Sequence, residues 1–158
     1  MAAKGLAHEV CITRLLKTLV SLLGDLATLR CQAPLNLSPD SQPEPDFTLV
    51  RNRPDDYLSA HPSAADVLLL IEISDSSLDY DRRIKLPLYA EAGIEHYWIF
   101  NLGVRVLETY SQPLALGRES TYRNQQNLTP EQAIALPSFP ALPLPLAPYF
   151  PRRAEPLN

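Results

Sequence analysis

The sequence predicts an α/β fold in which a mixed β-sheet is flanked by helices. Three patterns support this class: an amphipathic helical pattern over residues 6–26, a continuous apolar run over residues 67–74, and a second helical pattern over residues 76–93. The chain has 158 residues, of which 46% are hydrophobic and 20% are charged. This size and composition are typical of a globular protein that buries its own core.

The first half of the chain is expected to contain one helix and two short strands before the apolar run. Apolar residues recur at helical spacing from Val10 to Leu23, and Gly24 is expected to end this helix. A short strand is expected near residues 27–33, and a second over residues 45–50. Proline-rich and turn-forming segments separate these strands from each other and from the apolar run.

The apolar run VLLLIEIS is expected to be a central strand, and the segment after it a helix. The run is rich in β-branched residues, which suits a strand that is buried on both faces. In the helix, Ser76 is expected to act as the cap, and Gly93 to end it. Pro87 lies inside this helix and is expected to kink it.

The last third of the chain has two clear strands and then a proline-rich segment. Residues 96–102 and 104–110 predict a hairpin. Half of the 16 prolines lie from Pro130 onward, which excludes a helix or a central strand there. We therefore divide the chain into a domain of residues 1–128 and an extended arm of residues 129–158, packed on the same domain or on a partner.

Composition excludes several kinds of protein. A net charge of −4 does not favour nucleic-acid binding through a broad basic surface, so any such surface must be local, or helped by a bound cation or an oligomer. No apolar run is long enough to cross a membrane, and no secretory signal is found, so we expect a cytoplasmic protein. Phosphate-binding glycine loops, nucleophile elbows and zinc-protease motifs are also absent from the sequence.

Glu72 is the strongest candidate for a functional residue. It lies in the apolar run, and strand alternation places it on the same face as Ser74. A carboxylate in such a strand costs several kcal/mol unless it is paired or binds a metal. The alternatives are a structural salt bridge to Lys85 or Arg82, or a strand end that already reaches solvent.

Four further residues are placed where they could join Glu72. Asp46 begins the neighbouring strand, although an Asp in this position is often a turn or cap residue. Asp81, Lys85 and Tyr89 are spaced by four residues and are expected to lie along one face of the second helix.

A divalent cation would explain two carboxylates on neighbouring strands. Each of Asp46 and Glu72 would raise the pKa of the other unless a cation lay between them. Mg²⁺ suits this pair, because it takes oxygen ligands and needs only one or two protein carboxylates. Lys85 could then orient an attacking water, or stabilise the charge that grows on a phosphorus atom.

Other polar residues are weaker candidates. Glu9 lies on the first helix as a possible outer-shell ligand, with exposure to solvent as the alternative. His8 is expected to be either a phosphate contact or an exposed residue on a frayed helix end. His96 and Trp98 are explained by packing within the sheet.

The segments PEPDFTLV and VLLLIEISDSSLDYDRRIKLPLYAEAGIEHYWIFNL resemble the Uma-two family of restriction-endonuclease-like proteins, a branch of the PD-(D/E)XK nuclease superfamily. The resemblance runs from about Pro45 to Tyr110. It implies a restriction-endonuclease-like core with the order α-β-β-β-α-β, metal-dependent hydrolysis of DNA, and often a homodimer.

The resemblance also implies roles for individual residues. Asp46 corresponds to the Asp of the PD motif, and Glu72 to the (D/E) position. The superfamily lysine would fall at position 74, where this chain has Ser74. The missing amine is then expected from Lys85 on the helix, with Asp81 one turn before it.

Two hypotheses follow. In the first, the chain is a DNA endonuclease that uses Mg²⁺, with Mn²⁺ as an alternative. Asp46, Glu72 and the backbone carbonyl of Ile73 hold the metal, Lys85 positions water, and Asp81 holds Lys85 or an outer-shell water. In the second, the chain is a non-catalytic module that binds nucleic acid or protein on the same scaffold, as its acidic balance, Ser74 and its proline-rich tail suggest.

Overall fold

A six-stranded mixed sheet is the centre of the structure, a computed structural model that describes residues 5–38 and 40–152. The strands lie side by side in chain order: β1 (Thr28–Cys31), β2 (Phe47–Val50), β3 (Val67–Ser74), β4 (His96–Asn101), β5 (Val106–Leu114) and β6 (Thr121–Leu128). Only β3 and β4 run parallel, whereas the other neighbours are antiparallel. Because parallel neighbours need a crossover connection, the helical segment between β3 and β4 runs back over one face of the sheet.

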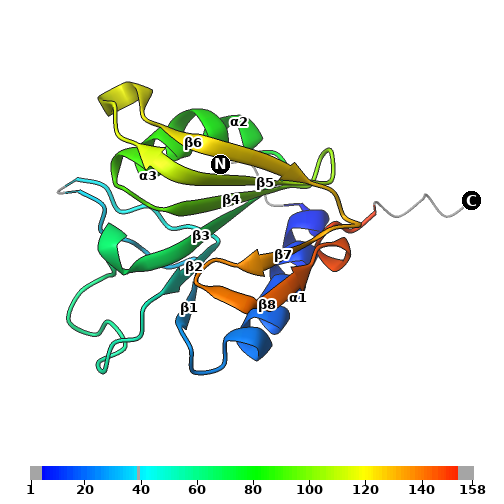
Figure 1. Cartoon of the computed structure of the whole chain (residues 1–158), viewed down its shortest axis with the longest axis horizontal. Helices are drawn as coiled ribbons and strands as arrows, with labels where there is room; N and C mark the ends of the chain where they lie inside the picture. Colours follow the sequence, from blue (N-terminus) through cyan, green and yellow to red (C-terminus); the bar gives the residue numbers. More distant parts are fainter. Residues whose placement is uncertain (1–4, 39, 153–158) are drawn as a thin grey trace, which may run out of the picture.

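One face of the sheet is covered by helix α1 (Leu6–Leu23) and by the C-terminal hairpin of β7 (Ala133–Leu136) and β8 (Phe139–Pro145). Figure 1 shows α1 (blue) and this hairpin (orange) together on one side of the sheet. The buried face of α1 carries one residue per turn at helical spacing: His8, Cys11, Leu15, Leu19 and Leu23. The predicted α/β class and the predicted first helix are both confirmed.

The opposite face is covered by the crossover, a helix that runs without a break from Leu78 to Glu91 and contains a π-helical turn before Pro87, where the sequence predicted a kink. It consists of α2 (Leu78–Tyr80), a π-helical turn η2 (Asp81–Lys85) and α3 (Leu86–Glu91). Pro87 has no N–H, and its ring would clash with the carbonyl four residues earlier, so the chain widens just before it. Gly93 ends the helix with a positive φ of 81°, as expected.

The start of the crossover also differs from the prediction. Ser77, not Ser76, precedes the first helical residue, and its side chain makes no capping hydrogen bond. The Ser77 hydroxyl instead donates to Asp81, which withdraws it from the helix end. Short 3-10 turns complete the structure: η1 (Ala64–Asp66), η3 (Gly117–Glu119) and η4 (Ala147–Tyr149).

The C-terminal segment is a hairpin rather than a wholly extended arm. Its prolines are tolerated because a two-stranded sheet leaves one edge of each strand without hydrogen-bonded neighbours. Leu136, Leu144, Leu146, Tyr149 and Phe150 are buried in the core that α1 and the sheet share. Residues 153–158 of the expected arm lie outside the described residues, and the division of the chain at residue 128 stays a prediction. No helix in the described part of the chain is long and apolar enough to cross a membrane.

Candidate active site

Asp46 and Glu72 come together because β2 and β3 are antiparallel neighbours. Asp46 directly precedes β2, whose first residue Phe47 lies opposite Ile71 on β3. The Asp46 N–H donates to Glu72 Oε1 at 3.2 Å, and the Ile73 N–H donates to Asp46 Oδ2 at 2.8 Å. Asp46 is 8% exposed and Glu72 3% exposed, so the main chain holds two nearly buried carboxylates side by side.

Lys85 and Asp81 reach the same place from the π-helical turn. Lys85 Nζ donates to Glu72 Oε2 and lies 3.4 Å from Asp81 Oδ1. Asp81 Oδ2 accepts hydrogen bonds from the hydroxyls of Ser74 and Ser77. Ser74 stands where the resemblance would place a lysine. Its hydroxyl anchors the Asp81 carboxylate, which lies next to Lys85.

The ion pair of Lys85 and Glu72 does not fully compensate the burial of the carboxylate. The pKa of Glu72 is raised to about 8: burial raises it most, Lys85 opposes the rise, and the charges of Asp46 and Asp81 add to it. Burial, the largest single effect, would lower the pKa of Lys85. The charge and hydrogen bond of Glu72, together with the charges of Asp81 and Asp46, outweigh it, and the net change is upward. The site therefore stabilises positive charge and resists additional negative charge.

His8 lies at the site as well, and the sequence had left it open between a phosphate contact and an exposed residue on a frayed helix end. It is buried rather than exposed on a frayed end, and its Nε2 lies 3.4 Å from Asp46 Oδ2. Its Nδ1 has no hydrogen-bond partner among the described residues. The spacing of His8 with Cys11 and Leu15 continues the buried stripe of α1, and this signal could have placed it inward.

Two other candidates are not among the residues that line the cavity over these carboxylates. Glu9 is exposed, with its Oε1 4.0 Å from His8 Nδ1. Tyr89 was expected on the same helix face as Asp81 and Lys85, but it is fully buried and packs edge-on against Tyr97. The wide turn before α3 explains the difference, because it rotates the residues that follow.

A cavity of about 780 Å³ opens over this cluster. Its walls come from the start of α1, the segment before β2, the end of β3 and the crossover, and its lining residues are Gly5, His8, Glu44, Asp46, Glu72, Ile73, Asp75, Ser76, Ser77, Tyr80, Asp81 and Lys85. Five of these are carboxylates, whereas Lys85 is the one Lys or Arg among the described lining residues.

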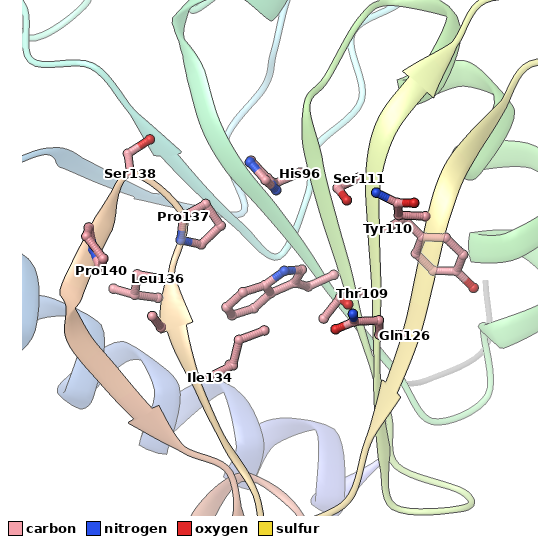
Figure 2. A pocket seen from close by; sticks show the side chains of 13 residues that line it. His96, Thr109, Tyr110, Ser111, Gln126, Ile134, Leu136, Pro137, Ser138 and Pro140 are labelled. Carbon is pink, nitrogen blue, oxygen red and sulfur yellow. The ribbon is translucent and has the colours of Figure 1, made fainter.

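A second hollow, of about 430 Å³, lies between the β7–β8 hairpin and strands β4, β5 and β6. Figure 2 shows Ile134, Leu136 and Pro137 of the hairpin facing Thr109 and Gln126 of the sheet. The described residues that line it include neither a carboxylate nor a Lys or Arg, so it offers no ionic ligand to a cation. The carboxylate-lined cavity is therefore the candidate active site.

The donor set suits a hard divalent cation that keeps part of its water shell. Among residues 5–38 and 40–152, no group of three or more His, Cys, Asp and Glu side chains is arranged to enclose a metal ion. Mg²⁺ does not need such a group, because one or two carboxylates with water and substrate phosphate suffice. Asp46 and Glu72 provide these oxygens, and a cation would offset the burial that raises the pKa of Glu72.

A mixed sheet with two carboxylates and a lysine at the end of its central strand defines a protein of the restriction-endonuclease-like class. The chain belongs to the Uma2 (Uma-two) family. The family model, described as "Putative restriction endonuclease", matches residues 1–147.

Comparison with solved structures supports the fold. The chain is similar to a crystal structure from Anabaena variabilis ATCC 29413, described as "a putative nuclease belonging to DUF820". The TM-score is 0.68 at 13% identity, over 95% of this chain and 83% of the other. A search of curated proteins finds no match to this chain. The predicted family and the predicted fold class are both confirmed.

Proposed function

We propose that this chain is a divalent-metal-dependent endonuclease that hydrolyses phosphodiester bonds of DNA. The observation that carries the proposal is the meeting of the Asp46 and Glu72 carboxylates at the ends of adjacent strands, with Lys85 bonded to Glu72. All three line one cavity that is open to a substrate. Membership of the Uma2 family supports the same class of reaction.

Asp46 and Glu72 would hold Mg²⁺ or Mn²⁺, together with the backbone carbonyl of Ile73. When bound, the cation supplies Lewis-acid stabilisation of the phosphate and lowers the pKa of a water molecule. The Ile73 N–H keeps the Asp46 carboxylate in place through a hydrogen bond of 2.8 Å. Asp46 is thus oriented by the main chain of the neighbouring strand.

Lys85 would position the attacking water and stabilise the charge that develops on the phosphate. Asp81 lies 3.4 Å from the ammonium of Lys85, so Lys85 keeps a carboxylate partner when Glu72 binds a cation. The hydroxyls of Ser74 and Ser77 hold Asp81 in this position. The lysine that the superfamily carries at position 74 is thereby replaced by a lysine and a serine that act together.

Two nearly isosteric substitutions test the proposal. Asp46→Asn and Glu72→Gln each replace a carboxyl group by a neutral amide, and both are expected to abolish Mg²⁺-dependent cleavage of DNA while the domain stays folded. Cleavage is followed by gel electrophoresis with single-stranded and duplex DNA, and folding by circular dichroism. Glu91→Gln is the matched control, because Glu91 is an exposed carboxylate on α3 outside the cavity.

The outcomes separate the two hypotheses. Cleavage by the wild type and by Glu91→Gln, but not by the two site variants, supports the endonuclease. Equal cleavage by all four proteins contradicts the assignment of Asp46 and Glu72. If the wild type binds DNA but cleaves none with Mg²⁺ or Mn²⁺, the non-catalytic module is the better description.

A further inference from the structure

Tyr80 is an exposed aromatic residue at the edge of the carboxylate-lined cavity. It is the last residue of α2 and directly precedes Asp81, and it is 55% exposed although it lines the cavity. Ile84 lies four residues further on, on the neighbouring turn, and is 54% exposed. Tyr80 and Ile84 thus form an apolar row, called here the Tyr80 row, beside the row of Asp81 and Lys85.

The ring of Tyr80 lies close to the lysine of the proposed chemistry. The ammonium of Lys85 is 5.7 Å from the centre of the Tyr80 ring, within the range of a cation–π interaction. A phosphate that contacts Lys85 would therefore carry its neighbouring nucleotides past the exposed ring. An exposed aromatic ring is a surface on which a nucleobase can stack.

The charge of the cavity argues that such stacking is needed for binding. Proteins that grip duplex DNA by its phosphates do so with several Lys or Arg side chains. Here Lys85 is the one such side chain among the described lining residues, which include five carboxylates. Ionic contacts from the cavity therefore contribute little, and uncharged contacts must supply much of the affinity.

We propose that Tyr80 stacks against an unpaired base next to the phosphate that is cleaved, so that the substrate is single-stranded DNA or an unpaired stretch such as a flap or a loop. This inference rests on the proposed function and adds the substrate class to it. In a continuous duplex both faces of each base are already stacked, and exposing one has an energetic cost. An unpaired base offers its face to Tyr80 without that cost.

The test uses one oligonucleotide as a single strand and as a duplex, with fluorescence anisotropy in EDTA for binding and Mn²⁺-dependent cleavage for activity. Wild type is expected to bind the single strand at least about 10-fold more tightly than the duplex. Tyr80→Ala is expected to weaken binding of the single strand by about 10-fold, whereas Tyr80→Phe keeps the ring and the affinity. Leu58→Ala is the matched control, because Leu58 is 90% exposed and lies outside the cavity.

Abasic substitutions at successive positions of the single strand locate the stacked base. One position is expected to weaken wild-type binding while leaving the binding of Tyr80→Ala unchanged, which is the signature of a direct contact. Unchanged binding of the single strand by Tyr80→Ala, or a preference of wild type for the duplex, overturns the inference. If wild type cleaves no DNA, the proposed function fails. The anisotropy measurements do not depend on cleavage, so they still test whether Tyr80 stacks on a base.

Discussion

At the scale of single residues, Lys85 combines two roles that one substitution can separate. Its ammonium neutralises buried Glu72, and in the proposed reaction it also positions water. Lys85→Met keeps an aliphatic chain but removes the charge, so cleavage is expected to fall about 10²- to 10³-fold. Binding of Mn²⁺ is expected to be kept or tightened, because no ammonium competes with the cation for Glu72.

Calorimetry with Mn²⁺ and a cleavage assay measure the two effects on the same protein. Arg83→Met is the control, since the ion pair of Arg83 with Asp79 is exposed at both ends and contributes little. A parallel loss of Mn²⁺ binding and cleavage in Lys85→Met would contradict separate roles and leave Lys85 as a structural partner of Glu72.

The residues of this site differ in how readily the sequence revealed them. Asp46 and Glu72 could be paired because their strands, β2 and β3, follow each other in the chain and consecutive strands are often neighbours in a sheet. A carboxylate inside an apolar strand also needs a partner. For His8 the sequence left two alternatives open, a phosphate contact or an exposed residue on a frayed helix end, and the phase of the helix turns the side chain inward. The anchoring of Asp81 by Ser74 depends on the path of the crossover, and no local pattern encodes that path.

At the scale of elements, an ion pair between the exposed Arg82 and the buried Glu108 ties the π-helical turn to the sheet. Glu108 on β5 is buried and accepts two hydrogen bonds from Arg82, one from Tyr110 and one from Asn101. Burial raises the pKa of Glu108, but these hydrogen bonds outweigh it, and the net pKa lies below its ordinary value of 4.5. The same contacts hold the turn that carries Lys85.

Glu108→Gln is expected to lower the free energy of unfolding at neutral pH by about 1.5–3 kcal/mol, because charge-assisted hydrogen bonds are lost. The folded-state pKa of Glu108 is lowered, so its contribution is present above pH 4.5 and is lost as pH falls through that lower folded-state pKa. Urea unfolding at a series of pH values should therefore show the difference between wild type and variant shrinking toward low pH. A difference that stays constant down to pH 3 would show that its source is packing and not charge.

The sequence did not predict the elements whose conformation is determined by contacts with distant parts of the chain and not by a local pattern of apolar residues. Strand β6 reads TYRNQQNL, which has no apolar alternation, because it is an edge strand paired only with β5 in the described structure. The π-helical turn lies directly before Pro87, which cannot continue the regular hydrogen bonding of an α-helix. The same turn carries Asp81 and Lys85. Strongly periodic segments such as α1 and the apolar strand β3 were predicted well, because burial alone determines their pattern.

At the scale of the whole molecule, the edges of the sheet bear on the expected homodimer. Strands β1 and β6 end the sheet on its two sides, and β6 is eight residues long. A long edge strand is a surface on which a second copy can pair or pack. The homodimer stays a prediction, and light scattering on the purified chain measures it directly.

Because the net charge of the chain is −4, we expect the affinity for DNA to depend only weakly on salt concentration. With Lys85 as the one Lys or Arg among the described cavity residues, few counterions are released, so log K against log [salt] is expected to have a slope shallower than about −2. Anisotropy measurements on a single-stranded oligonucleotide between about 50 and 200 mM salt test this expectation. A dimer that showed a slope of about −5, and lost it on dilution to monomers, would contradict it. Such a result would mean that two acidic subunits assemble a basic surface between them, and that phosphate contacts outside the cavity dominate binding.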